Sequence, residues 1–240
     1  MVHRALAAAA ALVALAFALS TFERWLLRRR RHDLAWSVAL VLFALAAGGL
    51  GAGVGVGWSD PVFRWFYFFG AIANVPVLAL GTVYLLRGQR RGDRWAAAVA
   101  LAVAFAGGVV AVAPFAQPID RAALIPQGSD VFGVLPRVLA AVASAGGALV
   151  IFLGAAWSAL RFRRVARRMV AANVLIALGT AILSASGLLN SVADEMTGFA
   201  ITLVAGISVL FAGFLVATTP SAAPGAAASP PAHAGAAARS

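Results

Sequence analysis

Polar side chains recur on one side of an otherwise apolar stretch, residues 58–86. At about 100° per residue along an α-helix, Tyr67, Asn74 and Tyr84 lie on the same face, whereas most of the large apolar side chains lie on the others. Hydroxyl and amide groups donate and accept hydrogen bonds, but they exchange protons poorly at neutral pH. The chemistry that this face favours is therefore hydrogen bonding to a neutral group, either on a neighbouring helix or on a bound molecule.

A proline interrupts the same stretch two residues after Asn74. Pro76 has no N–H, so the carbonyl of Ile72 loses its helical partner, and we predict a kink or a local rescue in the middle of the helix. Asp60 and Pro61 favour a helix start, because a carboxylate caps the first turn and proline is tolerated there. The sequence therefore predicts one long helix whose hydrogen-bond ladder is broken at mid-length.

A second polar row lies around residues 169–190, where Asn, Thr and Ser side chains recur within about 60° of one another. We call the two rows together the polar seam; its members are Tyr67, Asn74, Pro76, Tyr84, Asn173, Thr180, Ser184 and Ser191. Such rows face other helices or a cavity. Two interpretations stay open: the seam joins helices through hydrogen bonds, or it lines a site for a small neutral solute or a lipid group.

Residues for enzymatic or metal chemistry are scarce in this sequence. The chain has no Cys, and its three His residues, His3, His32 and His233, lie outside the apolar stretches. It contains no HExxH pattern, no Ser–His set and no membrane-embedded Asp pair. Acidic residues at or beyond the outer edge of the apolar stretches are Asp60, Asp120, Asp130, Asp194 and Glu195. We therefore predict a non-enzymatic protein with no catalytic residue, no metal site and no cofactor.

Composition places the chain in the membrane class. Hydrophobic residues make up 62% and charged residues 11%, with a mean hydropathy of +0.93, against roughly 45–50% and about 25% in soluble domains. We predict an all-α polytopic domain, residues 1–217, with seven transmembrane helices at about 5–27, 34–57, 62–86, 95–116, 138–160, 169–190 and 197–217. Residues 218–240 have few large apolar side chains, and we predict a disordered tail there.

Arginine runs determine the predicted orientation. They lie in alternate connections, at Arg28–Arg31, Arg87–Arg94 and Arg161–Arg168, and the positive-inside rule places such connections in the cytoplasm. The N-terminus is then outside and the C-terminus inside. The net charge of +11 consequently reflects topology and predicts a lipid bilayer as the partner, with no nucleic acid. All 19 basic residues are Arg, which favours a GC-rich bacterial source and hence a multi-pass protein of the bacterial plasma membrane.

The first predicted span has a competing interpretation, because it mimics a secretory signal peptide. Cleavage would put Arg28–Arg31 outside, against the charge rule, so we interpret the span as a helix. Near its end, Glu23 and Arg24 are interpreted as an interfacial pair or as two snorkelling side chains.

Glycines repeat every four residues in the second predicted span, at Gly49, Gly53 and Gly57. Glycine lets a neighbouring backbone approach closely in lipid, where no hydrophobic drive brings helices together. We predict that these glycines pack helices within the chain; a homo-oligomer or another membrane-protein partner is the alternative.

Spans 1–3 and 5–7 share a plan of helix, Arg run, helix, short acidic turn and helix, and the same interval separates Asp60 from Asp194 and Arg29 from Arg163. This 3+1+3 layout resembles, in topology only, the SWEET and PQ-loop carriers of sugars and amino acids, and the resemblance implies two parallel three-helix units joined by span 4. The stretch from Trp58 to Leu85 looks like the third helix of uncharacterised seven-helix membrane proteins of bacteria, a resemblance that implies no activity.

Together these features predict a membrane bundle that binds or transports a small neutral solute or a lipid group. The alternative is a membrane sensor or accessory subunit without transport activity, in which the seam only joins helices and a partner protein binds the Arg-rich face.

Overall fold

The computed structural model describes residues 2–121, 125–162, 167–192 and 196–218, which form helices and connections without a β-strand. The elements, in chain order, are α1 (Val2–Arg28), α2 (Arg31–Val56), α3 (Asp60–Tyr67), the π-helix η1 (Phe68–Ala73), α4 (Asn74–Arg87), α5 (Gln89–Val112), α6 (Gly128–Val131), α7 (Val134–Phe162), α8 (Arg167–Val192) and α9 (Met196–Thr218). The all-α prediction is confirmed for this part of the chain. From residue 219 onward the predicted tail lies outside the described residues.

Five helical segments are long and apolar enough to cross a membrane, by length and composition: Ala5–Arg28, Arg31–Val56, Asp60–Arg87, Gln89–Val112 and Val134–Arg161. Shorter apolar stretches, Val170–Leu183 and Ile201–Val216, lie within α8 and α9. These helices have the character of a membrane-embedded protein. The count of seven spans and their orientation stay predictions.

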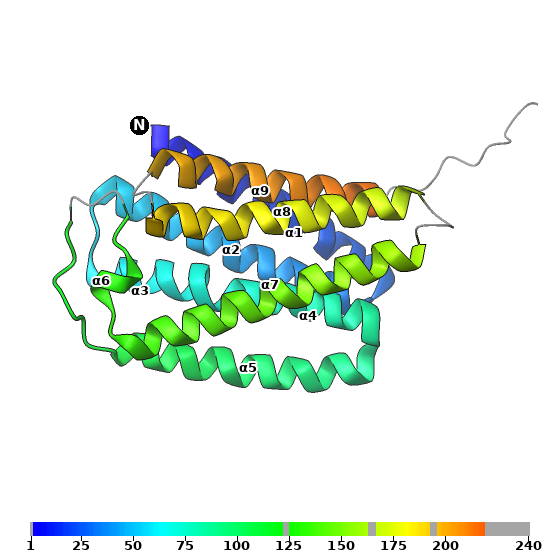
Figure 1. Ribbon diagram of the computed structural model, residues 1–240, viewed down its shortest axis with the longest axis horizontal. Coiled ribbons are helices and arrows are strands. Elements are labelled where there is room, and N and C mark those ends of the chain that lie inside the picture. The colour runs from blue at the N-terminus through cyan, green and yellow to red at the C-terminus, as the bar shows by residue number, and fades with distance from the viewer. Residues whose placement is uncertain (1, 122–124, 163–166, 193–195, 219–240) are drawn as a thin grey trace, which may run out of the picture.

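Six of the long helices close into a ring. Going round it, α1 packs on α2, α2 on α4, α4 on α7, α7 on α8, α8 on α9, and α9 returns to α1. Helix α5 lies outside the ring against α4 and forms one edge of the bundle (Figure 1). Its large apolar side chains, including Trp95, Leu101 and Phe105, are exposed, as is expected of side chains that face lipid.

The two ends of the bundle differ in chemistry. The connections α1–α2 and α4–α5, which carry Arg runs, lie at one end, whereas α6 and the N-terminus lie at the other (Figure 1). At the α6 end, Arg64 of α3 donates to the carbonyl oxygen of Val110 and, at 2.8 Å, to that of Ala113. These carbonyls belong to the last turn of α5, where a cation is favourable. The same guanidinium lies 4.1 Å from the centre of the Phe115 ring.

The helix that contains Pro76 changes from α-helix to π-helix and back to α-helix before the proline. Residues Phe68–Ala73 form a π-helix that ends three residues before the proline, and the bonds of a π-helix span five residues instead of four. Pro76 itself lies in α4; its missing N–H would lie opposite Ala71 if the π spacing extended to it, and opposite Ile72 in the α spacing. The carbonyl oxygen of Ala71 accepts a hydrogen bond from Ser144 Oγ of α7 at 2.7 Å. A side chain of another helix therefore bonds to the carbonyl one residue before the one that the sequence singled out, and the rescue of Ile72 itself stays a prediction.

Small residues permit close packing at several helix crossings. A Cβ at Gly147 of α7 would lie 3.0 Å from the backbone of Val75, beside the Ser144 contact. In α2, a Cβ at Gly49 would lie 3.3 Å from Cα of Phe66, and one at Gly53 would lie 2.6 Å from the indole ring of Trp58. Residues of the same chain therefore pack closely against both glycines.

Gly57 differs from the two glycines before it. It follows the last residue of α2 with φ of 98°, a left-handed conformation that favours glycine. Its position ends the helix instead of packing one helix against another.

Candidate functional site

The residues of the predicted polar seam lie in different surroundings. Tyr67 is buried at the α6 end, where its ring centre lies 4.9 Å from that of Phe132 and 5.9 Å from that of Phe63. A Cβ at Gly128 would lie 2.4 Å from the Tyr67 ring, so this side chain is enclosed on several sides. Tyr67 belongs to a packed aromatic cluster.

Asn74, next along the seam, is also buried, and it follows the π-helix directly. Its side-chain oxygen has no hydrogen-bond partner among the described residues. Tyr84, near the other end of α4, donates to Asp93 Oδ1 at 2.8 Å, and Arg31 Nη1 pairs with the same oxygen at 2.5 Å. Tyr84 therefore helps to join α2, α4 and α5 at the Arg-rich end.

A cavity of about 70 Å³ lies at the centre of the ring, in the half nearer the Arg-rich end. All six ring helices contribute to its wall, and its lining is mostly apolar, with Phe17, Trp36 and Phe214 as the aromatic members. Three polar side chains line it as well: Thr82, Ser158 and Asn173. Asn173 Nδ2 donates to Ser158 Oγ at 2.9 Å and so joins α8 to α7 across the wall.

Of the predicted seam, Asn173 is the member that lines this cavity. Thr180, two turns further along α8, donates to the carbonyl oxygen of Ile176 in its own helix at 2.8 Å. The side chains of Ser184 and Ser191 lie outside the described part of the structure. The seam is therefore not one continuous surface: Tyr67, Asn74 and Tyr84 do not line the cavity, and α7 packs between α4 and α8.

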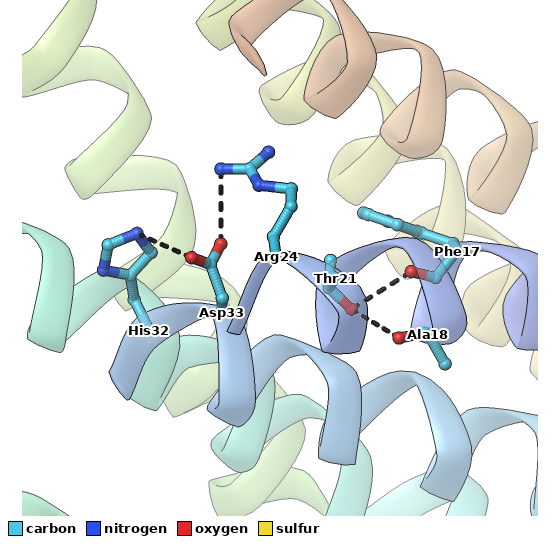
Figure 2. Close-up of polar contacts among 6 residues, drawn as sticks. All are labelled: Phe17, Ala18, Thr21, Arg24, His32 and Asp33. Atoms are coloured by element: carbon cyan, nitrogen blue, oxygen red, sulfur yellow. Dashed lines mark hydrogen bonds and ion pairs between the residues drawn. The ribbon is translucent and has the colours of Figure 1, made fainter. Parts of the chain in front are cut away.

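A buried charged cluster lies beside the cavity, where α1 and α2 meet (Figure 2). Asp33 has a fully buried side chain, and its Oδ1 lies 3.3 Å from Arg24 Nη2. His32 Nε2 lies 3.7 Å from the other carboxylate oxygen. The interpretation of Arg24 as a partner of Glu23 or as a snorkelling side chain is wrong, because Arg24 reaches across the hairpin to an acid of the next helix.

Aromatic side chains connect this cluster with the cavity wall. The guanidinium of Arg24 lies 4.6 Å from the centre of the Phe214 ring, a cation–π distance. Trp36 packs between His32 and Phe214, with ring centres 5.2 Å and 5.9 Å away. Phe214 and Trp36 therefore touch the cluster on one side and line the cavity on the other.

Sequence reasoning missed Asp33 because the residue follows an Arg run, a context typical of solvated interface. The signal that could have found it is the short turn: only Arg29 and Arg30 lie between α1 and α2, so residues at similar distances from the turn lie at similar depth. Among the described residues, no three His, Cys, Asp or Glu side chains gather where they could hold a metal ion.

The chain was compared with protein-family models, with curated proteins and with solved structures, and none of the three comparisons found a match.

Proposed function

We propose that this chain is a multi-pass membrane protein without catalytic activity, and that it binds a small neutral solute, or a polar group of a lipid, in the central cavity of its helix ring. The observation that carries the proposal is the placement of Thr82, Ser158 and Asn173 on an otherwise apolar wall shared by six helices. Convergent polar groups in an apolar pocket are the usual arrangement of a small-molecule site.

The lining favours a neutral ligand. It contains no side chain that is charged at neutral pH, and an ion moved there would lose its hydration without gaining a partner of opposite charge. A hydroxyl or amide group, in contrast, can bond to Ser158 or Asn173 while its apolar part contacts Trp36 or Phe214. The volume of about 70 Å³ holds several water molecules, since each needs about 10–15 Å³ by this measure. Entry of a larger solute therefore requires the ring to open.

In a bacterial plasma membrane, with seven spans and the Arg-rich end inside, the cavity would lie in the cytoplasmic half of the bilayer. The arrangement of the helix ends supports this orientation, because the α1–α2 and α4–α5 connections, which both carry Arg runs, lie together at one end (Figure 1). A solute would then reach the site from the cytoplasm or from the inner leaflet.

A thermal-shift screen of the purified protein against neutral metabolites and lipids tests the proposal. A bound compound should raise the unfolding temperature of the parent in a concentration-dependent way. Asn173→Leu should remove this response, because it deletes the amide that lines the cavity. Thr180→Val is the matched control: it deletes a polar seam group of the same helix that bonds to its own backbone, and it should keep the response.

The screen also distinguishes this function from the alternative, a sensor or accessory subunit. That function is favoured by the packing of Tyr67 against Phe63 and Phe132, which supports a structural role for this part of the seam. If no compound stabilises the parent, and a membrane protein or a second copy co-purifies in fixed ratio, the accessory function stands and the solute site is refuted.

A further inference from the structure

The Arg24–Asp33 pair leaves several charged atoms without hydrogen bonds. Asp33 is fully buried, yet neither of its carboxylate oxygens has a hydrogen-bond partner among the described residues. The same is true of Arg24 Nε and Nη1, while Nη2 faces the carboxylate at 3.3 Å. A buried ion pair is favourable only when the remaining donors and acceptors are also satisfied, so this cluster is chemically incomplete.

The neighbouring hydroxyl groups do not complete it. Thr21 Oγ1 donates to the carbonyl oxygens of Phe17 at 3.0 Å and Ala18 at 2.9 Å, pointing away from the carboxylate (Figure 2). Ser37 Oγ donates to the carbonyl oxygen of Ala18 at 2.9 Å. His32 Nε2 is 3.7 Å from the nearer carboxylate oxygen, beyond hydrogen-bond distance. The hydroxyl groups of Thr21 and Ser37 thus donate to the backbone and not to the carboxylate.

We infer that Arg24 and Asp33 form a binding site for a zwitterionic group, one that carries an ammonium and a phosphate or carboxylate a few bonds apart. The ammonium would donate to Asp33, and the anionic oxygens would accept from Arg24 Nε and Nη1. An anion alone would meet the carboxylate and a cation alone would meet the guanidinium, so only a group with both charges complements the pair. Charge-assisted hydrogen bonds of this kind are short and strong.

The position of the pair suits such a group. It lies at the turn between α1 and α2, beside the exposed Arg28–Arg31 run, where the polar head groups of a membrane would be. The side chains of Arg24 and His32 beside Asp33 are 19% and 14% exposed, so the pair lies close to the surface of the bundle. Ethanolamine phospholipids and free amino acids share the required chemistry.

This site is separate from the central cavity, because Phe214 and Trp36 lie between the two. The inference therefore does not rest on the proposed function. Its test uses variants of different residues, so the two proposals can fail independently: Asn173→Leu tests the cavity, and the substitutions at Arg24 and Asp33 test the pair.

The main variant is the double substitution Arg24→Met with Asp33→Leu. It removes both charges, and exchanging a buried ion pair for packed apolar side chains is often neutral or stabilising. Arg29→Gln is the matched control, since it removes an exposed arginine at the same membrane depth and leaves the pair intact. Each protein is purified in detergent and its bound lipids are counted by native mass spectrometry during titration with phosphatidylethanolamine, phosphatidylcholine or phosphatidylglycerol.

We expect the parent and Arg29→Gln to bind phosphatidylethanolamine more tightly than the other two lipids, because its ammonium has N–H donors and phosphatidylcholine has none. The double variant should bind it at least about tenfold more weakly. A parallel thermal-shift titration with glycine and with phosphoethanolamine identifies the source: a response to these soluble probes assigns a solute, whereas a response to the lipid alone assigns a head group.

Asp33→Asn keeps the test decisive if the double variant does not fold. It replaces one carboxylate oxygen with an NH2 group of similar size and removes the negative charge. It should therefore abolish the preference for phosphatidylethanolamine over phosphatidylcholine. The inference is overturned if the parent neither prefers phosphatidylethanolamine to phosphatidylglycerol nor responds to glycine or phosphoethanolamine. It is also overturned if the preference or the response survives in the double variant or in Asp33→Asn.

Discussion

Replacing Ser144 by Ala tests whether a hydroxyl of α7 completes the backbone of the interrupted helix. Ser144 Oγ donates to the carbonyl oxygen of Ala71 at 2.7 Å. In the five-residue register of the preceding π-helix, the backbone donor opposite Ala71 is residue 76, which is proline. Without the hydroxyl, the carbonyl would lie in the middle of the bundle with no donor.

The expected loss of unfolding free energy follows from the position of the Ala71 carbonyl inside the bundle. Interhelical hydrogen bonds in membrane proteins contribute on average ~0.6 kcal/mol and at most about 1.7 kcal/mol. The acceptor here is a backbone carbonyl far from the ends of the bundle, and an unsatisfied backbone group is costly in hydrocarbon. We therefore expect Ser144→Ala to lower the free energy of unfolding by about 1–1.5 kcal/mol, toward the upper end of that range.

A second substitution makes the test specific. Pro76→Ala restores a backbone N–H, which can bond to the same carbonyl and make the hydroxyl dispensable. In the Pro76→Ala background, Ser144→Ala should then cost less by at least about 0.5 kcal/mol, the smallest coupling that a double-mutant cycle resolves. Effects of the proline on the unfolded chain cancel in the cycle, because they are the same with and without the hydroxyl.

Reversible unfolding in mixed micelles of mild detergent and dodecyl sulfate, followed by tryptophan fluorescence, measures the four free energies. Ser208→Ala is the control, since Ser208 is an exposed hydroxyl of α9 and its loss should change stability little. Equal costs of Ser144→Ala in the two backgrounds would show that the hydroxyl and the proline are not linked, and the proposed rescue would be wrong.

The remaining predictions concern orientation and packing. A Cys introduced at Ser129 should react with an impermeant thiol reagent in intact cells, and one at Gln89 only after the cells are opened; the reverse pattern would invert the topology. Gly53→Ala should lower the free energy of unfolding by about 1–3 kcal/mol and Gly53→Leu by more, because even a Cβ there meets the ring of Trp58 at 2.6 Å; melting temperatures equal to the parent's would mean that the ring moves freely. Tyr84→Phe should cost less than about 1 kcal/mol, since its bond to an aspartate is partly solvated, and a larger loss would show that this contact is a main stabiliser of the Arg-rich end.

Several features of the fold could be predicted because they depend on one helix at a time. Long apolar stretches predict helices by length and composition, and the structure has helices in each predicted span. Helix α3 starts at Asp60 with Pro61 in its first turn, as predicted, but Ser59 is the N-cap residue and no side chain makes a capping bond. The disturbance at Pro76 likewise follows from a missing N–H, which no neighbouring helix can restore to the proline itself.

The surroundings of the polar seam residues could not be predicted from one helix at a time. Helical periodicity states which side chains share a face, but it does not state what that face touches. Tyr67 and Asn173 both lie on polar rows, yet one packs among aromatic rings and the other lines a cavity. The difference comes from helix order around the ring and from the position of α7 between α4 and α8, which are properties of packing.

The sequence by itself determined the helical class, the membrane character and an interruption near the middle of the third long helix, because these are consequences of local composition and of backbone chemistry. Tertiary structure decided that Ser144 donates to the carbonyl oxygen of Ala71 and that Asp33 is buried against Arg24. In both cases the partner comes from another helix, and its identity depends on how the helices rotate and approach. The free energy of a buried polar group is fixed by its surroundings, and those surroundings exist only once the helices have packed.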